Sequence, residues 1–181
     1  MRVSLGSERI YLRDYNSNDV QDLYEFLSID EVVKYEPYSA MSFGECKKEV
    51  KRRMNDPSFY AVILRENEKM IGNIYFEQTQ PYKFRTYELG YVFNPKYWNM
   101  GYATEAASII LRYGFSSLNA HRIIANCNQL NDRSIKLLER IGMRRESSSK
   151  DDIYFHCTKD GEPLWQSSYM YAILNDEYMT R

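Results

Sequence analysis

The stretch Tyr91-Val-Phe-Asn-Pro-Lys-Tyr-Trp-Asn-Met-Gly-Tyr-Ala-Thr-Glu105 joins a strand pattern to a helix pattern through one short loop. Asn94-Pro95 ends the strand, because proline cannot donate to a strand ladder, and the helix begins just after Gly101. The first N–H groups of a helix have no partners within it and lie at the positive end of its dipole. With glycine at 101 and alanine at 103, a ligand can approach this backbone closely. The stretch is therefore typical of a phosphate or pyrophosphate cradle, although a plain strand-to-helix turn would use the glycine equally well.

Two widespread phosphate-binding motifs do not fit this stretch. A Rossmann fingerprint needs G-x-G-x-x-G and an acidic residue about 20 residues further on, but only Gly101 is present and the region near His121 is not acidic. A P-loop needs G-x-x-x-x-G-K-[ST], which the sequence does not contain. Both motifs are excluded.

Toward the N-terminus, the residue pattern predicts strands and two helices. Alternating or apolar runs predict strands over residues 9–13, 59–65, 70–77 and 86–93. An apolar stripe from Val20 to Leu27 predicts an amphipathic helix. Ser42-x-x-Glu45 is a capping box, which predicts a second helix that Asn55-Asp56-Pro57 ends.

Toward the C-terminus, the pattern predicts a helix from about 102 to 117, a strand over 122–127 and a helix from about 132 to 141 that ends at Gly142. The last third, Met143 to Tyr178, is predicted to form strands around the Asp160-Gly161 turn. Hairpin-length connections indicate antiparallel pairs, whereas the helix between Phe93 and Arg122 implies one parallel crossover. We therefore expect an α+β fold with a mixed, mostly antiparallel sheet and helices on both faces.

Composition narrows the function further. The 181 residues carry 24 Lys and Arg against 25 Asp and Glu, a formal net charge of −1. This balance excludes a strongly basic nucleic-acid-binding protein, so no nucleic-acid partner is expected. No run approaches the ~18 apolar residues of a membrane span, and residues 1–15 contain no apolar segment typical of a signal peptide. We expect a cytoplasmic protein with no membrane partner, forming one domain over residues 1–181.

Cysteines and histidines are few. Cys46, Cys127 and Cys157 are far apart and form no C-x-x-C pair, which argues against a disulfide framework or a cysteine-rich metal site. We expect buried or half-buried thiols. With only His121 and His156, a multi-histidine metal centre or a Ser-His-Asp triad has little to draw on, and no metal is expected.

Three blocks of sequence resemble one family. Trp98-x-x-Gly101-x-Ala103, followed by Thr104-Glu105-Ala106, resembles the acyl-CoA-binding signature of the GNAT superfamily of N-acetyltransferases, in particular the ribosomal-protein N-terminal acetyltransferase (RimJ/RimL-like) branch. A second block of this chain is similar to that branch as well: Ile123-Ile124-Ala125, then Asn131-x-x-Ser134, then Leu137 to Met143. The opening Ser7 to Arg13 is similar to that branch's first strand. The resemblance extends over about residues 7 to 175.

The resemblance implies the GNAT fold, with a central pair of splayed strands, and acetyl-CoA as co-substrate. Pantetheine would enter the split and pair with main-chain groups of the preceding strand, and the pyrophosphate would lie on backbone N–H groups of the loop and first helical turn. Asn131 would hydrogen-bond the pantetheine arm. The cofactor-binding residues implied in this way are Tyr91, Val92, Phe93, Asn99, Met100, Gly101, Tyr102, Ala103, Thr104 and Asn131.

Glu88 is the candidate general base. Acetyl transfer needs a neutral amine, whereas a lysine ammonium has a reference pKa of ~10.4 and an α-amine of ~8. By strand alternation Glu88 shares a face with Gly90 and Val92. Carboxylates at this position often serve as base in the family, directly or through water. The alternative is an exposed strand glutamate paired with a lysine.

Ser134 is the candidate that assists the leaving thiolate. Many family members place a tyrosine four residues later, but here that position is Leu138, which cannot donate a proton. The ribosomal-protein branch carries a serine at the position of Ser134. The alternative is that Ser134 only caps its helix.

Several other positions have candidate roles. Asn99 stands where many relatives have glycine, and Trp98 is expected to pack under the loop. Tyr35, Tyr38 and Trp165 are candidates for the acceptor cleft, although core or surface roles fit each equally well.

The sequence thus favours an acetyl-CoA-dependent N-acetyltransferase that acts on a primary amine, either a protein N-terminal amine or a small amine, by direct attack in a ternary complex. The alternative is a non-catalytic acyl-CoA-binding or regulatory module, which the leucine at 138 favours slightly. The apolar last strands, Tyr169 to Ile173, are compatible with a homodimer, but such composition is more often core.

Overall fold

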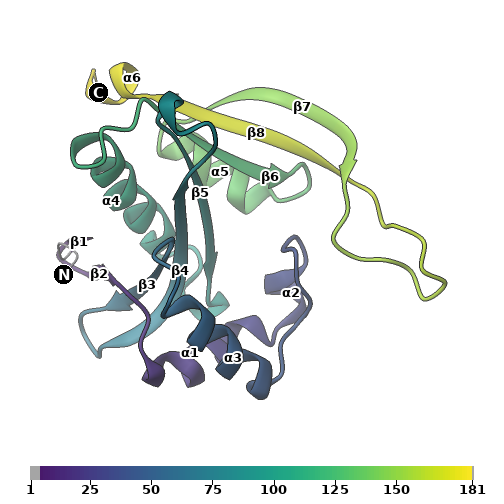
Figure 1. Cartoon of the computed structure of the whole chain (residues 1–181). Helices are drawn as coiled ribbons and strands as arrows, with labels where there is room; N and C mark the ends of the chain where they lie inside the picture. The colour runs from purple at the N-terminus through teal and green to yellow at the C-terminus, as the bar shows by residue number, and fades with distance from the viewer. Residues whose placement is uncertain (1–4, 181) are drawn as a thin grey trace.

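The computed structural model describes residues 5–180, and in that part of the chain eight strands form one sheet in the order β1-β2-β3-β4-β5-β6-β8-β7 (Figure 1). The strands are β1 (Leu5–Gly6), β2 (Ile10–Arg13), β3 (Phe59–Leu64), β4 (Lys69–Gln78), β5 (Thr86–Phe93), β6 (Arg122–Asn128), β7 (Arg144–Ile153) and β8 (Gln166–Leu174). The α-helices are α1 (Val20–Leu27), α2 (Asp30–Val33), α3 (Phe43–Arg53), α4 (Tyr102–Ser116), α5 (Asp132–Arg140) and α6 (Asn175–Met179). Short 3₁₀ helices are η1 (Ser17–Asp19), η2 (Tyr82–Phe84) and η3 (Pro95–Tyr97).

One strand pair of this sheet is parallel. β5 pairs with β6 in parallel, whereas the other neighbouring strands are antiparallel. The parallel pairing covers only Thr86–Glu88 against Arg122–Ile124. Beyond it, β5 follows β4 and β6 follows β8, so the two strands diverge (Figure 1). The predicted mixed, mostly antiparallel sheet and the splayed central pair are confirmed.

Each face of the sheet has its own apolar core, made by alternate residues of the same strands. Leu89 and Phe93 of β5 pack on the face that α4 and α5 cover. Val92 packs with α1 and α3 on the other face. Because side chains alternate along a strand, Glu88 and Gly90 belong to the same face as Val92. The predicted helices on both faces are confirmed.

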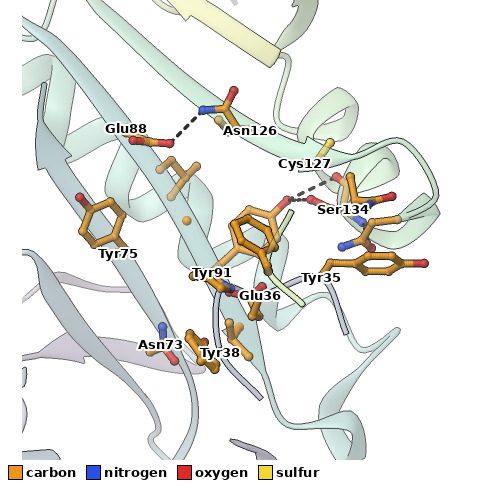
Figure 2. Close-up of a pocket in the computed structure, with 18 of the residues that line it drawn as sticks. Tyr35, Glu36, Tyr38, Asn73, Tyr75, Glu88, Tyr91, Asn126, Cys127 and Ser134 are labelled. Carbon is orange, nitrogen blue, oxygen red and sulfur yellow. Dashed lines mark hydrogen bonds between the residues drawn. The ribbon is translucent and has the colours of Figure 1, made fainter. Parts of the chain in front are cut away.

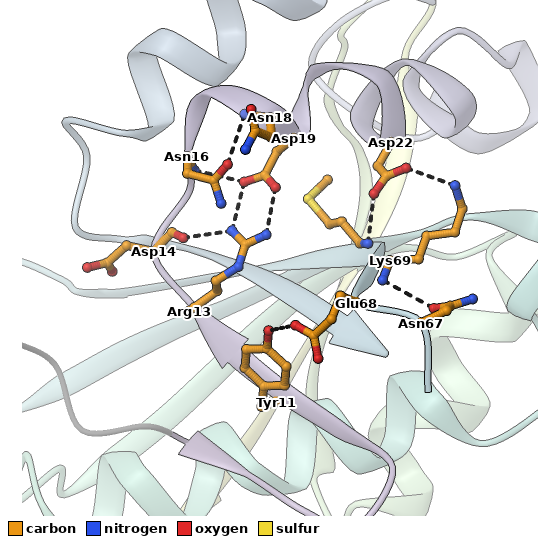
Figure 3. Close-up of polar contacts among 11 residues, drawn as sticks. Tyr11, Arg13, Asp14, Asn16, Asn18, Asp19, Asp22, Asn67, Glu68 and Lys69 are labelled. Atoms are coloured by element: carbon orange, nitrogen blue, oxygen red, sulfur yellow. Dashed lines mark hydrogen bonds and ion pairs between the residues drawn. The ribbon is translucent and has the colours of Figure 1, made fainter. Parts of the chain in front are cut away.

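The start of α1 is fixed to the sheet by a polar cluster (Figure 3). The Asp19 carboxylate accepts two hydrogen bonds from the Arg13 guanidinium at 2.8 and 2.7 Å, in the bidentate geometry that makes such pairs strong. One turn later, Asp22 accepts from Lys69 Nζ at 2.8 Å and from the Met70 N–H at 2.9 Å. These contacts hold α1 at the first residues of β4 and thereby set where α2 and its loop begin.

The second helix starts at the predicted capping box. The Ser42 hydroxyl accepts from the Glu45 N–H, and the Glu45 carboxylate accepts from the Ser42 N–H at 2.8 Å. Two free N–H groups are thereby satisfied at the beginning of α3.

The end of the chain differs from its prediction in one element. β7 and β8 form the expected antiparallel pair, with the Asp160-Gly161 turn between them and Gly161 at a φ of 87°. Residues Asn175–Met179, however, form α6 and not a strand. The Glu177 carboxylate accepts from the Leu174 N–H at 2.8 Å, which caps a helix at that point. The short α2 was not predicted either.

Candidate active site

The loop before α4 has the conformation that a close-approach cradle requires. Gly101 is the N-cap of α4 at a φ of 84°, which an L side chain rarely adopts, and a Cβ there would lie 3.4 Å from Arg9 Nη2. Asn99 also has a positive φ, 62°. With Gly101 in this conformation, the unpaired N–H groups of the first turn of α4 lie at an open loop suited to an anion.

Side chains from other elements hold this loop. Arg9 donates from Nε to Glu105 at 2.8 Å and from Nη1 to the Met100 carbonyl at 3.1 Å, and its guanidinium lies 4.5 Å from the centre of the Tyr102 ring. The ion pair also neutralises Glu105, a carboxylate in the first turn of α4. Arg140 donates to Thr104 Oγ1 at 3.2 Å from the opposite side.

A cavity of about 820 Å³ opens from this loop and reaches the diverging part of β5. Three cations of α5, spaced along one face of the helix, line it: Arg133, Lys136 and Arg140. These three cations were not among the predicted site residues, although their i, i+3 and i+7 spacing predicts one face of a helix. An N–H cradle, nearby cations and an unpaired strand edge fit a long, polyanionic ligand such as CoA, and we call this space the cofactor cavity.

The predicted cofactor residues do not all reach this cavity. Those that line it are Tyr91, Val92, Phe93, Asn99, Gly101, Ala103, Thr104 and Asn131. Met100 is exposed and Tyr102 packs under Arg9, so neither side chain lines the cavity. The Phe93 carbonyl already accepts from Trp98 Nε1 at 2.9 Å, which places Trp98 under the loop as predicted. Asn131 caps α5 by accepting from the Ser134 N–H at 3.2 Å.

A second cavity of about 840 Å³ is lined by residues of both diverging strands, β5 and β6 (Figure 2). It is also bordered by the loop after α2, by α3, and by residues of the β7–β8 hairpin, among them Asp152, Phe155 and Gln166. The two cavities meet, because they share the lining residues Tyr35, Glu36, Tyr91, Val92, Asn131 and Ser134. We call the second space the acceptor cavity.

Glu88 lies where the strands separate. It is the last β5 residue paired with β6, opposite Ile124. Its carboxylate accepts a hydrogen bond from Asn126 Nδ2 at 2.9 Å (Figure 2). Glu88 lines the acceptor cavity but not the cofactor cavity, and among the described residues it forms no ion pair with a lysine.

Ser134 lies at the junction of the two cavities. Its hydroxyl is 2.7 Å from the Tyr91 hydroxyl (Figure 2). Burial raises the pKa of the nearby Cys127 thiol to about 11, and a hydrogen bond from Ser134 acts in the opposite direction. Leu138, at the position where many family members have a tyrosine, is fully buried in the core and offers no polar group to this junction.

Glu36, which the sequence analysis did not identify, is the carboxylate that lines both cavities. It follows α2 in the loop that also carries Tyr38. Burial raises the pKa of Glu36 to about 7, although a hydrogen bond with Tyr38 and the charge of Arg53 act in the opposite direction. A carboxylate with this pKa near the meeting point of two cavities is typical of a functional site.

Arg53 forms the floor of the acceptor cavity. Its side chain is only 1% exposed. It donates to Glu49 at 2.7 Å, to the Tyr15 hydroxyl at 3.0 Å and to Asn73 Oδ1 at 3.1 Å. The same arrangement lowers the pKa of Glu49 to about 2, because hydrogen bonds and charges from Arg52 and Arg53 outweigh its burial. This paired arginine ties α3 to Asn73 of β4 and to Tyr15, in the segment before α1.

Of the predicted acceptor-cleft aromatics, two line the acceptor cavity. Tyr35 and Tyr38 do so, and the Tyr35 hydroxyl donates to the Leu130 carbonyl at 3.2 Å. Trp165 lines neither cavity. It is 55% exposed on the hairpin, where it contacts Tyr154 edge-on.

Other expectations have mixed outcomes. Cys46 and Cys127 are buried, whereas Cys157 is exposed. Among residues 5–180, no group of three His, Cys, Asp or Glu side chains is arranged to hold a metal ion. Within the same range, no helix is both long and apolar enough to cross a membrane.

Comparison with known proteins agrees with this geometry. Residues 9–144 match the acetyltransferase (GNAT) domain family. The chain is 40% identical over 180 residues to the uncharacterized N-acetyltransferase YnaD of Bacillus subtilis, covering 97% of this chain and 99% of that protein. It is 30% identical over 122 residues to the [ribosomal protein uS5]-alanine N-acetyltransferase of Escherichia coli, covering 67% of this chain and 60% of that protein. The crystal structure of a GNAT-family acetyltransferase from Bacillus anthracis superposes with a TM-score of 0.86 at 36% identity, covering 97% of this chain and all of that one. The chain therefore belongs to the GNAT family of N-acetyltransferases.

Proposed function

We propose that this enzyme transfers the acetyl group of acetyl-CoA to a primary amine by direct attack, with both substrates bound together. The observation that carries the proposal is the shared wall of the two cavities. A thioester in one cavity and an amine in the other can meet beside Tyr91, Val92 and Ser134 without crossing protein. Holding both reactants in place removes the entropic cost of bringing them together during the reaction.

The cofactor cavity would hold the donor. Acetyl-CoA supplies the acyl group when bound. The pantetheine would lie along the unpaired edge of β5, its diphosphate would accept from N–H groups of residues 99–104, and Lys136 and Arg140 would offset its negative charge. The N–H of Val92 or Phe93 would hold the thioester oxygen as negative charge develops on it.

The acceptor cavity would hold the amine. Glu36 would attract the acceptor while it is still an ammonium ion, because it lies at the junction and its described neighbours include no cation that pairs with it directly. Glu88 would then take the proton, directly or through water, so that the neutral amine can attack. Ser134 would hydrogen-bond the sulfur as the C–S bond breaks.

The acceptor itself is proposed as a protein N-terminal amine or a small amine. The relative that acetylates ribosomal protein uS5 supports the first class. The acceptor cavity is bordered on several sides by aromatic rings and carboxylates, among them Tyr35, Tyr38 and Glu36, which suits a cationic amine of either class.

Thiol release from acetyl-CoA tests the proposal. The panel contains peptides with Ser, Ala or Met N-termini, polyamines, amino acids and aminoglycosides. Release with one class supports the proposal and identifies the acceptor. If acetyl-CoA raises the melting temperature but no acceptor releases thiol, the acyl-CoA-binding module is favoured. If acetyl-CoA neither binds nor reacts, the donor assignment is wrong.

A further inference from the structure

The phenol of Tyr91 lies against the serine that we propose to assist the leaving thiolate. Tyr91 Oη is 2.7 Å from Ser134 Oγ and 3.3 Å from the Ser134 carbonyl oxygen. Tyr91 extends from β5 and Ser134 from the first turn of α5, so the contact joins the two sides of the junction (Figure 2). The family resemblance implies only a main-chain role for Tyr91.

The two hydroxyls can be arranged in a way that aims one proton at a sulfur atom. A hydroxyl has one proton to donate and can accept from others. If Tyr91 donates to Ser134 Oγ across the shorter distance, the Ser134 proton is free to point into the junction. A sulfur atom is already accommodated near this serine, because Cys127 and Ser134 both line the acceptor cavity (Figure 2).

Resting on the proposed function, we propose that Tyr91 is a positioning residue: its phenol donates to Ser134 Oγ and so directs the Ser134 hydroxyl at the sulfur of the departing CoA. As the C–S bond breaks, its electron pair goes to sulfur, and the resulting thiolate accepts the Ser134 hydrogen bond. Both hydroxyls keep their protons, and the thiolate takes a proton from solvent after it leaves the cavity. Burial raises the pKa of Tyr91 and outweighs the hydrogen bond with Ser134, which acts in the opposite direction, so the phenol stays neutral and keeps its proton.

This arrangement explains how the site functions with Leu138 at a position that cannot donate. Hydrogen bonds to an ionised group are stronger than neutral ones, and the donor is aligned before charge develops on the sulfur. The Tyr91 phenol, supplied by β5, thus acts on the leaving sulfur through Ser134 of α5.

Leaving-group dependence tests the proposal. We compare wild type, Tyr91→Phe, Ser134→Ala and the double variant with acetyl-CoA and with an analogue in which selenium replaces sulfur. A selenolate is a better leaving group and needs less stabilisation. Tyr87→Phe is the matched control, because Tyr87 lies on the same strand and face and its hydroxyl has no hydrogen bond among the described residues.

With acetyl-CoA, Tyr91→Phe is expected to lower kcat about 10-fold without raising KM for the donor. With the selenoester, the loss should shrink to about 2-fold or less. The double variant should be no slower than Ser134→Ala, since Tyr91 acts only through Ser134. The ratio of rates with the two donors is measured on the same folded protein, so it does not depend on how much of the variant folds.

Three results would each overturn this inference while leaving the proposed function intact. The first is a Tyr91→Phe enzyme as fast as wild type and Tyr87→Phe with acetyl-CoA. The second is an equal loss with both donors. The third is a double variant in which the losses of Tyr91→Phe and Ser134→Ala multiply. If wild type releases no thiol with any acceptor, it is the proposed function that fails.

Discussion

Replacing Glu36 by glutamine removes the ionisable group at the junction of the two cavities while keeping the size of the side chain. Burial raises the pKa of this carboxyl to about 7. Because the pKa is raised, the charged form is lost as the pH falls through 7: about 91% of the group is ionised at pH 8 and about 9% at pH 6. If ionised Glu36 binds the acceptor ammonium, wild-type kcat/KM for the acceptor falls about 10-fold between these pH values from this group alone.

The loss expected in Glu36→Gln follows from the same contact. A hydrogen bond to a charged group contributes about 1.5–3 kcal/mol, so at pH 8 the KM for the acceptor should rise about 10- to 100-fold. The kcat at saturating acceptor should change little, because Glu88 is the group proposed to take the proton. The inflection near pH 7 should disappear.

The assay measures kcat/KM for two acceptors with different ammonium pKa values, an α-amine near ~8 and an alkylamine near ~10.4. An inflection that belongs to the enzyme stays near pH 7 with both acceptors, whereas one that belongs to the substrate moves. Glu66→Gln, an exposed glutamate in the β3–β4 turn, is the control for loss of one negative charge. If Glu36→Gln keeps both the wild-type KM and the inflection, Glu36 does not bind the ammonium and the reasoning is refuted.

Three further changes test other parts of the site. Glu88→Gln should lower kcat about 100-fold, most strongly at low pH, with acetyl-CoA binding unchanged; an unaltered pH–rate profile would remove Glu88 as the base. Arg140→Gln should raise KM about 10-fold for acetyl-CoA and equally for its 3′-dephospho form, since Arg140 contacts Thr104 of the cradle; a loss confined to the 3′-phosphorylated donor would move Arg140 away from the diphosphate. Arg53→Met should lower the free energy of unfolding by about 3–5 kcal/mol, because it leaves the charge of Glu49 partly uncompensated and Asn73 without its partner. Calorimetry should show a Tm lower by about 10 °C. An unchanged Tm would contradict the structural role of this arginine.

The regular elements were predictable because their signals are local. The bounds of β5, Thr86–Phe93, match the predicted strand, since alternation and Asn94-Pro95 lie within that stretch itself. The start of α3 was predicted equally well, because the Ser42–Glu45 capping box is a local signal. Asn175–Tyr178 was predicted wrongly as strand, because the apolar, strand-like sequence before it continues up to Leu174 and the helix depends on one capping contact from Glu177.

The chemical environment of the site was less predictable, because it depends on residues far apart in the chain. The pKa of Glu36 depends on its burial at the junction and on Arg53, which belongs to another helix. The Tyr91 side chain meets Ser134 only because β5 and β6 diverge and α5 returns to the opening. The positions of Glu88 and Ser134 were identified from the family resemblance, but their partners, Asn126 and Tyr91, required the fold.

Amide hydrogen exchange with and without acetyl-CoA most directly tests the claim that the split between β5 and β6 and the loop before α4 form the donor site. Exchange should slow in the free edge of β5, residues 89–93, and in the cradle, residues 99–104, while the β3–β4 turn, residues 65–68, which lines neither cavity, should be unchanged. Arg140→Gln should need a higher acetyl-CoA concentration for the same protection. If acetyl-CoA binds but exchange in both segments stays as it is in the free protein, the donor site lies elsewhere and the central claim is contradicted.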